Sequence, residues 1–357
     1  MVCPASHDVR WRCRLVLPLH PRETRAEQEC STDRVGAHRA AGTMMQSAVS
    51  PTCSRQAVGQ HGTRSRMQTC DTADFKSALL RSSRSVLARE RAAMARAALA
   101  DCHLCAHHCG VNRLKAPAGL CHAGAEARFF SAQVEVSDEL ELIPTFAVAL
   151  SGCDLRCDFC ITGRPSWNPR AGESFDVCAM AAKAKRALDQ GARTMMILGG
   201  EPTIHLPAAL ELVAALSDSA KLVWKTNAHG SAQARELLEG MFDVWLADFK
   251  FGNDECAQRL AKVRDYIRIV RENLVWANQH SELIVRHLVM PGHVECCWRP
   301  VAEWLAESLP GVKVNLRSGF WPAWRAARHS ELGGTVSSAE TERAWEIARQ
   351  CGLNCVQ

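Results

Sequence analysis

Short apolar runs alternate with amphipathic stretches along the chain after residue 140. The runs are rich in β-branched residues and predict six strands, at 145–150, 194–198, 222–226, 244–247, 283–289 and 312–316. Helical spacing of apolar residues predicts helices over 177–188, 208–216, 232–238 and 338–350. Strands that alternate with helices in this way are typical of parallel βα units. We therefore predict an α/β fold, a partial, TIM-like (β/α)6 barrel with its chemistry at the carboxyl ends of the strands.

The N-terminal part of the chain has a different pattern. Residues 1–75 are rich in Arg, Ser, Thr, Gln and Ala without sustained apolar periodicity, so we expect a disordered segment or an over-extended start. Apolar residues at helical spacing predict a helix over 74–99, and a cysteine-rich stretch follows it. The predicted organisation is a disordered N-terminus (1–75), a helix with a small cysteine-rich segment (76–140) and a core domain (141–357).

Composition and charge narrow the class of protein. The chain of 357 residues is 47% hydrophobic, which is enough for a sizeable core. No stretch approaches the roughly 18 consecutive apolar residues of a membrane span. The net charge of +5 comes from residues 1–90, which hold 14 Lys and Arg against 8 Asp and Glu, while the remainder holds 29 against 30. A nucleic-acid-binding surface would need a basic cluster in the folded part. We therefore expect a cytoplasmic protein that binds neither membrane nor nucleic acid.

The cysteines carry the strongest chemical signal. Directly after the first predicted strand, Cys153, Cys157 and Cys160 form a C-x3-C-x2-C pattern. In a cytoplasmic chain with 18 cysteines, such short spacings indicate metal or cluster ligands rather than disulfides. Structural zinc and electron-transfer clusters usually take four protein ligands, whereas a cubane held by three leaves one iron free to bind another group. The pattern therefore predicts an open iron–sulfur cluster.

This loop resembles the defining signature of the radical S-adenosylmethionine (SAM) superfamily, in which an aromatic residue precedes the third cysteine, as Phe159 does here. The sequence Gly199-Gly200-Glu201-Pro202, after the second strand, is similar to the GGEP motif of that family. The resemblance implies a [4Fe-4S] cluster on the three cysteines and SAM on its free iron, with GGEP at the SAM amino group. It also implies that the reduced cluster cleaves SAM to a 5′-deoxyadenosyl radical.

Polar residues at later strand ends resemble segments of glycyl-radical activating enzymes. Asn227, Asp248 and Lys250 follow the third and fourth predicted strands, and Arg286 lies in R-H-L-V-M-P-G on the fifth. By resemblance, these residues line the pocket for SAM and substrate, while an ordinary buried ion pair is the alternative for Asp248 and Lys250. Alternation along a strand places Arg286 and His287 on opposite faces, so Arg286 is the cation expected inside the barrel.

A second cysteine group precedes the barrel. Cys102, Cys105, Cys109 and Cys121 follow a C-x2-C-x3-C-x11-C pattern, and four thiols suit a closed zinc site or a second iron–sulfur cluster. The surrounding residues resemble the N-terminal segment of a radical SAM branch related to pyruvate formate-lyase activating enzyme, although many members of that branch lack a full GGEP. Other downstream cysteines have no complete ligand spacing and are expected to be ordinary thiols: Cys178, Cys256, Cys296, Cys297, Cys351 and Cys355.

These features predict a radical SAM enzyme that abstracts hydrogen from a bound substrate. By resemblance, the leading version is an activase that installs a glycyl radical on a partner protein, and modification of a peptide or small metabolite is the alternative. A low-potential flavodoxin or ferredoxin would supply the electron. A non-catalytic iron–sulfur or zinc protein is the alternative from another class. A fourth thiolate closing the site of residues 153–160 would distinguish it.

Overall fold

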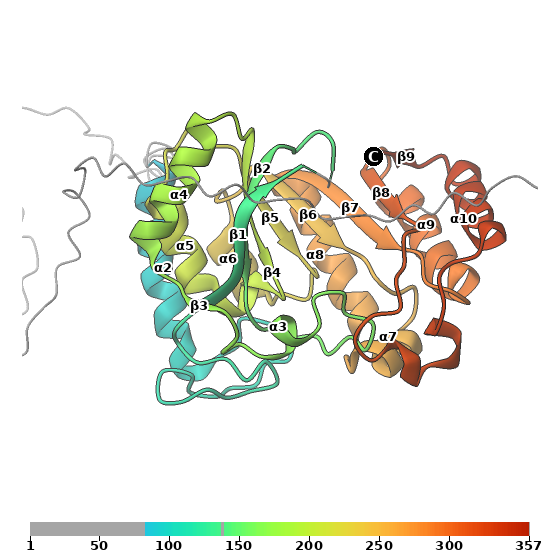
Figure 1. The fold of residues 1–357 in the computed structure, drawn as a ribbon, viewed down its shortest axis with the longest axis horizontal. Coiled ribbons are helices and arrows are strands. Elements are labelled where there is room, and N and C mark those ends of the chain that lie inside the picture. Colours follow the sequence, from blue (N-terminus) through green and yellow to red (C-terminus); the bar gives the residue numbers. More distant parts are fainter. Residues whose placement is uncertain (1–82, 137–138, 357) are drawn as a thin grey trace, which may run out of the picture. The chain divides into compact units, whose positions relative to one another are not determined.

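The computed structural model describes residues 83–136 and 139–356 (Figure 1). The predicted disorder of residues 1–75 lies outside the described residues, as does the start of the helix expected over 74–99. The described part of that helix is α2, Arg84–Ala98. It begins where the Ser83 side chain accepts a hydrogen bond from the backbone N–H of Val86, a common way to cap a helix N-terminus.

One sheet organises the described residues, with strand order β3-β1-β2-β4-β5-β6-β7-β8-β9. The strands are β1 (Arg128–Glu135), β2 (Thr145–Leu150), β3 (Glu173–Ser174), β4 (Thr194–Gly199), β5 (Leu222–Thr226), β6 (Val244–Asp248), β7 (Glu282–Leu288), β8 (Lys313–Arg317) and β9 (Asn354–Cys355). From β2 onward each neighbouring pair is parallel, and the six predicted strands agree with β2 and β4 to β8 within one residue at each end. The edge strands β3 and β9 do not pair with each other, which confirms the predicted unclosed barrel.

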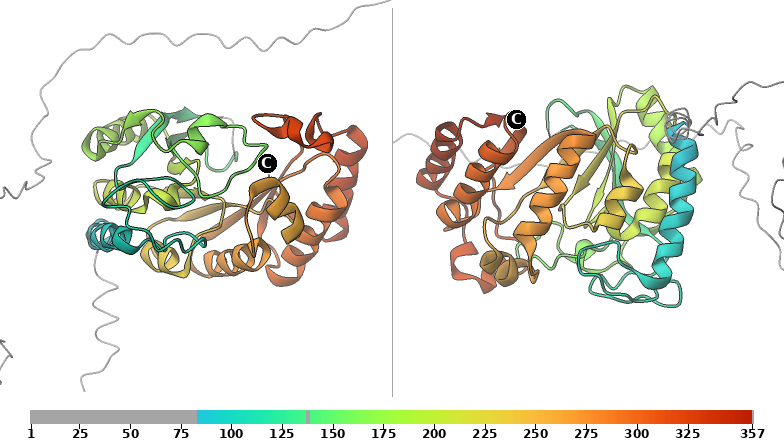
Figure 2. Two further views of the ribbon diagram at one scale, coloured as in Figure 1. Left: turned by 90° about the horizontal axis from the view of Figure 1, so that it is seen from below. Right: turned by 180° about the vertical axis from the view of Figure 1, so that it is seen from behind.

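Most helices lie along the outer side of the curved sheet (Figure 2). After α2, the helices are α3 (Arg164–Trp167), α4 (Val177–Asp189), α5 (Leu206–Ala214), α6 (Ala232–Leu238), α7 (Asp254–Ala261), α8 (Tyr266–His280), α9 (Arg299–Ser308) and α10 (Ser338–Gln350), with a short π-helix at Val294–Trp298. The short α3 lies instead beside the cavity at the carboxyl ends of the strands, where Ser166 and Trp167 line it. The predicted helices agree with α4, α6 and α10, and α5 begins two residues earlier than predicted. In the described part of the chain, no helix is long and apolar enough to cross a membrane.

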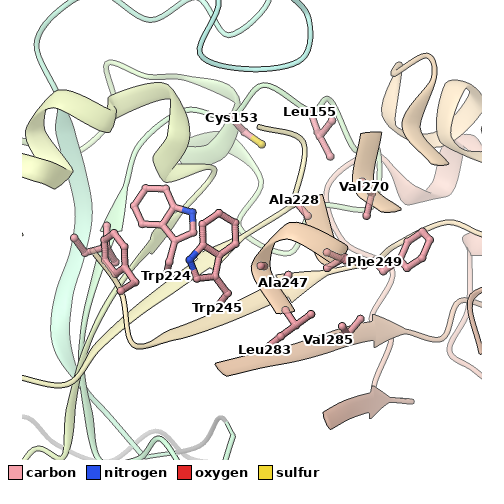
Figure 3. Packing of buried hydrophobic residues seen from close by; sticks show 14 of the residues in the cluster. Cys153, Leu155, Trp224, Ala228, Trp245, Ala247, Phe249, Val270, Leu283 and Val285 are labelled. Carbon is pink, nitrogen blue, oxygen red and sulfur yellow. The ribbon is translucent and has the colours of Figure 1, made fainter. Parts of the chain in front are cut away.

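The two faces of the parallel strands bury different side chains. Trp224, Trp245 and Leu283 belong to the core between sheet and helices, where Figure 3 shows them packed together. Leu246 and Ile284, their neighbours along the chain, belong to a smaller cluster on the inner face. Because side chains alternate along a strand, this inner face continues beyond the cluster to the side chains at the carboxyl ends. The polar residues of the predicted site lie at that end.

The segment before β2 is joined to the sheet in two places. Helix α2 packs along α5 through a stripe of small buried residues, Ala88, Ala92 and Ala95. Strand β1, which the apolar pattern did not predict, pairs antiparallel with β2 over Phe129–Glu135. Residues assigned to the cysteine-rich segment therefore add a strand to the sheet of the predicted core domain.

Candidate active site

The three cysteines of the C-x3-C-x2-C pattern lie in the loop after β2. Cys153, Cys157 and Cys160 line one cavity of about 840 Å³, and no fourth cysteine among the described residues lines it. Around a single ion, the ligand atoms are expected to lie close together. In the described part of the chain, these three thiols do not all lie within 4.8 Å of one another. The donor set therefore fits a cluster with an open iron better than a closed zinc site.

This cluster loop, residues 151–163, is anchored to α7 and to aromatic side chains. The backbone N–H groups of Arg156 and Asp158 donate to the carbonyls of the last two residues of α7, at 3.0 and 2.9 Å. The Phe159 ring, which precedes the third cysteine, packs against Phe251 and Phe320 with centroid distances of 6.0 and 6.3 Å. The loop is thus fixed on both sides before any cofactor binds.

Burial disfavours the ionised form of the Cys153 and Cys157 thiols. It raises the pKa of Cys153 well above its ordinary value, and it raises the pKa of Cys157 to about 12 although Lys250 acts in the opposite direction. Iron binds thiolates, so assembly of a cluster here must displace protons. We therefore expect cluster assembly to be favoured by alkaline conditions.

The two glycines after β4 bring backbone to the cavity wall. A Cβ atom on Gly199 would lie 2.1 Å from Leu150 O, and one on Gly200 would lie 2.0 Å from Gly152 O. Both glycines line the cavity. Since only glycine permits such an approach, the motif fixes the end of β4 directly against the cluster loop.

Glu201 and Pro202 are buried behind this wall and do not line the cavity. The Glu201 carboxylate accepts hydrogen bonds from the Thr226 hydroxyl at 2.9 Å and from the Asn227 N–H at 2.7 Å. Burial, together with the charge of Asp154, raises the pKa of Glu201 to about 7. In this structure Glu201 positions the end of β5, and its contact with the SAM amino group stays a prediction.

Asp154 is a buried carboxylate that the sequence motifs did not single out. Its Oδ1 accepts a hydrogen bond from Asn227 Nδ2 at 2.7 Å, and its Oδ2 lies 2.9 Å from His229 Nδ1. Burial would raise the pKa of Asp154, but His229 and Asn227 outweigh it and lower the pKa below its ordinary value. Asn227 Nδ2 also lies 3.7 Å from Cys153 Sγ. A fixed negative charge therefore lies beside a cluster ligand, where it can tune the reduction potential.

Asp248, Lys250 and Arg286 bring charge to the cavity. Lys250 pairs with Asp248, as the ion-pair alternative predicted, and Arg286 Nε lies 3.5 Å from Asp248 Oδ1 and 3.4 Å from Glu139 Oε1. Burial would raise the pKa of Asp248, but the two cations lower it. The lining as a whole holds four cationic residues and two acidic ones: Lys225, Lys250, Arg286 and Arg317 with Glu135 and Asp248. This excess of positive charge suits a ligand carboxylate.

His287 points away from the cavity, as alternation along β7 predicts. Burial lowers the pKa of His287 to about 4, so the imidazole is neutral at physiological pH. Its Nδ1 lies 2.7 Å from the backbone carbonyl of Phe249, to which it donates. His287 therefore fixes the segment after β6 rather than contacting a ligand.

The four cysteines before the barrel surround a small cavity of their own, which Cys102, Cys105, Cys109 and Cys121 all line. Burial raises the pKa of Cys105 and of Cys121. Arg113 Nη1 lies 3.5 Å from Cys102 Sγ. These four thiols are likewise not gathered within 4.8 Å of one another in the described residues, and their binding of zinc or of a second cluster stays a prediction.

The cysteine-rich segment contacts the loops that hold the active-site residues. The Ala106 N–H donates to His229 O at 3.0 Å, and His107 Nε2 lies 3.1 Å from Asp154 O. Both acceptors belong to the loops after β2 and β5. A metal at the N-terminal cysteines would therefore stabilise one wall of the active site.

The sheet is unclosed, and three cysteines lie at the wall of a cavity directly after its first parallel strand. This arrangement defines an enzyme core built around an open iron–sulfur cluster. The chain belongs to the radical SAM superfamily, whose family model matches residues 148–305. Membership implies a [4Fe-4S] cluster and SAM as cofactors, and the cavity provides the three thiols that such a cluster requires.

Several known proteins are similar to this chain. Uncharacterized protein MJ0674 of Methanocaldococcus jannaschii is 30% identical over 266 residues, which cover 72% of this chain and 76% of that protein. The structure of Streptococcus suis SuiB bound to S-adenosylmethionine aligns with a TM-score of 0.46 at 17% identity, over 57% of this chain and 47% of that chain. A domain of pyruvate-formate lyase-activating enzyme from Bacteroides vulgatus ATCC 8482 aligns with a TM-score of 0.36 at 18% identity. The alignment covers 45% of this chain and 96% of that chain. This chain spans less than half of SuiB.

Proposed function

We propose that the protein uses the SAM-derived radical to abstract hydrogen from a peptide or protein segment, and that installing a glycyl radical on a partner protein is the leading version. The apolar rim of the cavity carries this proposal. Ile161 is 81% exposed, Trp321 66% and Leu140 60%, and all three line the cavity. Large apolar side chains exposed together around a binding site are typical of protein and peptide interaction surfaces.

The size of the cavity supports the same proposal. Its volume of about 840 Å³ is near the upper end of the roughly 300–1,000 Å³ typical of small-ligand pockets. SAM would occupy the part beside the cysteines, the glycines and the cationic side chains. The remaining space, next to the apolar rim, would admit a segment of a larger substrate.

When bound, the reduced cluster would supply one electron that cleaves SAM to methionine and a 5′-deoxyadenosyl radical, which takes a hydrogen atom from the substrate. Cys153, Cys157 and Cys160 would hold the cluster. The cationic lining would bind the SAM carboxylate, and the backbone at Gly199 and Gly200 would lie beside its amino group. These residues would hold the sulfonium in a fixed orientation and exclude water from it.

Deuterium transfer tests this proposal directly. Anaerobic protein would be incubated with dithionite, SAM and a glycyl-radical protein of the same organism labelled with [2-²H₂]glycine. We expect deuterium in 5′-deoxyadenosine and a glycyl radical signal in the electron paramagnetic resonance spectrum of the partner. Trp321→Ala should reduce the transfer while SAM cleavage without substrate persists. Met94→Ala, on α2, removes an apolar side chain that is 61% exposed and outside the cavity lining, and serves as the control.

Two other outcomes favour the alternatives. SAM cleavage without deuterium transfer from glycine would contradict the activase version and favour another peptide or a small metabolite as substrate. Iron-loaded protein that forms no 5′-deoxyadenosine would favour the non-catalytic alternative.

We also infer that the electron donor, a flavodoxin or ferredoxin with an acidic surface, docks at a basic cavity beside the cluster loop. This second cavity has a volume of about 610 Å³, and its charged lining residues are Arg235, Lys262, Arg264 and Arg268 with Asp265 and Glu272. Lys262 Nζ lies 3.4 Å from Asp158 Oδ2 in the cluster loop. A positive surface this close to the cluster suits an acidic donor, because opposite charges speed association.

A further inference from the structure

Four ligand-type side chains converge at α7, outside the cavity described above. Cys256, His293, Cys296 and Cys297 have ligand atoms that all lie within 4.8 Å of one another. With His293, the structure supplies these three cysteines with the complete ligand set that their spacing along the chain lacks. Spacing along the chain could not reveal the group, because Cys256 and His293 are 37 residues apart.

The distances within this group match the edges of a small tetrahedron. The Sγ atoms of Cys256, Cys296 and Cys297 lie 3.6, 3.3 and 3.5 Å from His293 Nδ1. Cys296 Sγ lies 4.0 Å from Cys256 Sγ and 3.9 Å from Cys297 Sγ. With Zn–S near 2.3 Å and Zn–N near 2.0 Å, tetrahedral zinc predicts edges of about 3.8 Å between sulfurs and about 3.5 Å between sulfur and nitrogen. A disulfide would need about 2.05 Å.

The backbone is shaped to hold the four ligands together. Cys296 and Cys297 are adjacent in the π-helix, and His293 immediately precedes it. The Asn253 side chain joins the two segments, because it accepts from the Cys256 N–H at 2.8 Å and donates to Cys296 O at 2.7 Å. A Cβ atom on Gly252 would lie 2.4 Å from Cys297 O, so the two segments also touch through backbone.

Two charged residues lie beside the outer ring nitrogen of the histidine. His293 Nδ1 faces the thiols, while its Nε2 lies 3.7 Å from Glu331 Oε1 and 3.3 Å from Arg259 Nη2. Glu331 also pairs with Arg259. A carboxylate beside the outer ring nitrogen is the usual companion of a zinc-bound histidine. The positive charge of Arg259 would offset the net negative charge of Zn²⁺ with three thiolates.

We propose that Cys256, His293, Cys296 and Cys297 bind one Zn²⁺ in a closed structural site. Three thiolates and one imidazole at tetrahedral spacing are a frequent donor set of structural zinc, and they leave no position for substrate. The ion would fix α7 to the π-helix. Since the end of α7 accepts the backbone hydrogen bonds of Arg156 and Asp158, zinc would also stabilise the cluster loop.

Metal content of the full chain tests this site. Zinc and iron per chain would be measured by mass spectrometry on anaerobically purified wild type, Cys296→Ser, His293→Cys and Cys351→Ser. We expect Cys296→Ser to lose one zinc equivalent relative to wild type. His293→Cys keeps four ligands and should keep that zinc, and Cys351→Ser is a matched control outside the group. Subtracting the zinc content of Cys296→Ser from that of wild type removes any zinc bound by the N-terminal cysteines.

A spectroscopic measurement identifies the donor set. Protein grown with Co²⁺ in place of Zn²⁺ should show intense thiolate-to-cobalt absorption, and Cys296→Ser should lose the part assigned to this site. Equal zinc in wild type and Cys296→Ser would overturn the proposal. So would loss of iron instead of zinc, or a disulfide between two of these cysteines in the wild type. Neither readout requires SAM cleavage, so both are independent of the proposed function.

Discussion

Two groups of cysteines follow the carboxyl ends of parallel strands, but their surroundings differ. The cluster loop, after β2, presents three thiols to an open cavity of about 840 Å³ with apolar and charged walls. The second group lies after β6 and β7 and consists of Cys256, His293, Cys296 and Cys297, whose four ligand atoms lie within 4.8 Å of one another. An open set leaves a position for a ligand, whereas a closed set leaves none. The comparison separates residues that can take part in chemistry from residues that support them.

The same substitution in both groups should have the largest and most different effects. Cys157→Ala should reduce 5′-deoxyadenosine formation to background, because the open cluster loses a ligand. Cys296→Ser should keep SAM cleavage but lower the melting temperature by on the order of 5–10 °C, as expected for a loss of about 2–3 kcal/mol. Anaerobic assays and thermal unfolding measure the two effects. Equal loss of cleavage in both variants, with the iron content of Cys296→Ser unchanged, would show that the closed group takes part in the chemistry.

Helix α7 carries Cys256 and contacts the cluster loop through its last turn, and Lys262 at its C-cap lines the basic cavity. Reversing two charges there, Arg264→Glu with Arg268→Glu, should slow SAM cleavage about tenfold at low salt when flavodoxin is the donor. The rate with dithionite should not change. Lys185→Glu with Arg186→Glu on α4 is the control, because both residues are exposed and outside this cavity. An equal decrease with dithionite would place the defect in the cluster instead of in docking.

Each group has one carboxylate close to its ligands, and their removal should have different consequences. Asp154→Asn removes a negative charge beside Cys153 and should raise the cluster reduction potential by on the order of tens of millivolts. Glu331→Gln should leave that potential unchanged and weaken zinc binding about 10-fold to 100-fold. Redox titration followed by electron paramagnetic resonance, and zinc competition with a chelator, measure these effects. Asp189→Asn, an exposed residue on α4, is the control.

The smallest expected effect concerns pH and Glu201. Burial first, and then the charge of Asp154, raise the pKa of Glu201 from 4.5 to about 7. The folded state therefore binds this proton more tightly than the unfolded state, and stability falls as the pH rises from about 4.5 through 7. Glu201→Gln cannot ionise, so its melting temperature relative to wild type should increase by roughly a few degrees between pH 5 and pH 8. A difference independent of pH would show that the Glu201 pKa is not raised.

The sequence located the parallel strands because each is a short apolar run bounded by turns. Strand β5 (Leu222–Thr226) was placed without error, since both of its faces are buried. Strand β1 was missed, because its residues are only partly buried and show no clear alternation. A strand at the margin of a sheet gains its structure from pairing with β2, which no local pattern records.

The same distinction applies to the sites. The sequence by itself singled out Cys153, Cys157 and Cys160 as one group, because three thiols within eight residues belong to one loop and their spacing is visible in the sequence. The net charge after residue 90 is close to zero, yet folding gathers Arg235, Lys262, Arg264 and Arg268 around one cavity. Likewise, only the tertiary structure placed His229 beside Asp154 and His293 beside Cys256. The side chains of each pair meet because parallel strands bring distant loops to one edge of the sheet. The spacing of these residues in the sequence therefore does not reveal the contact.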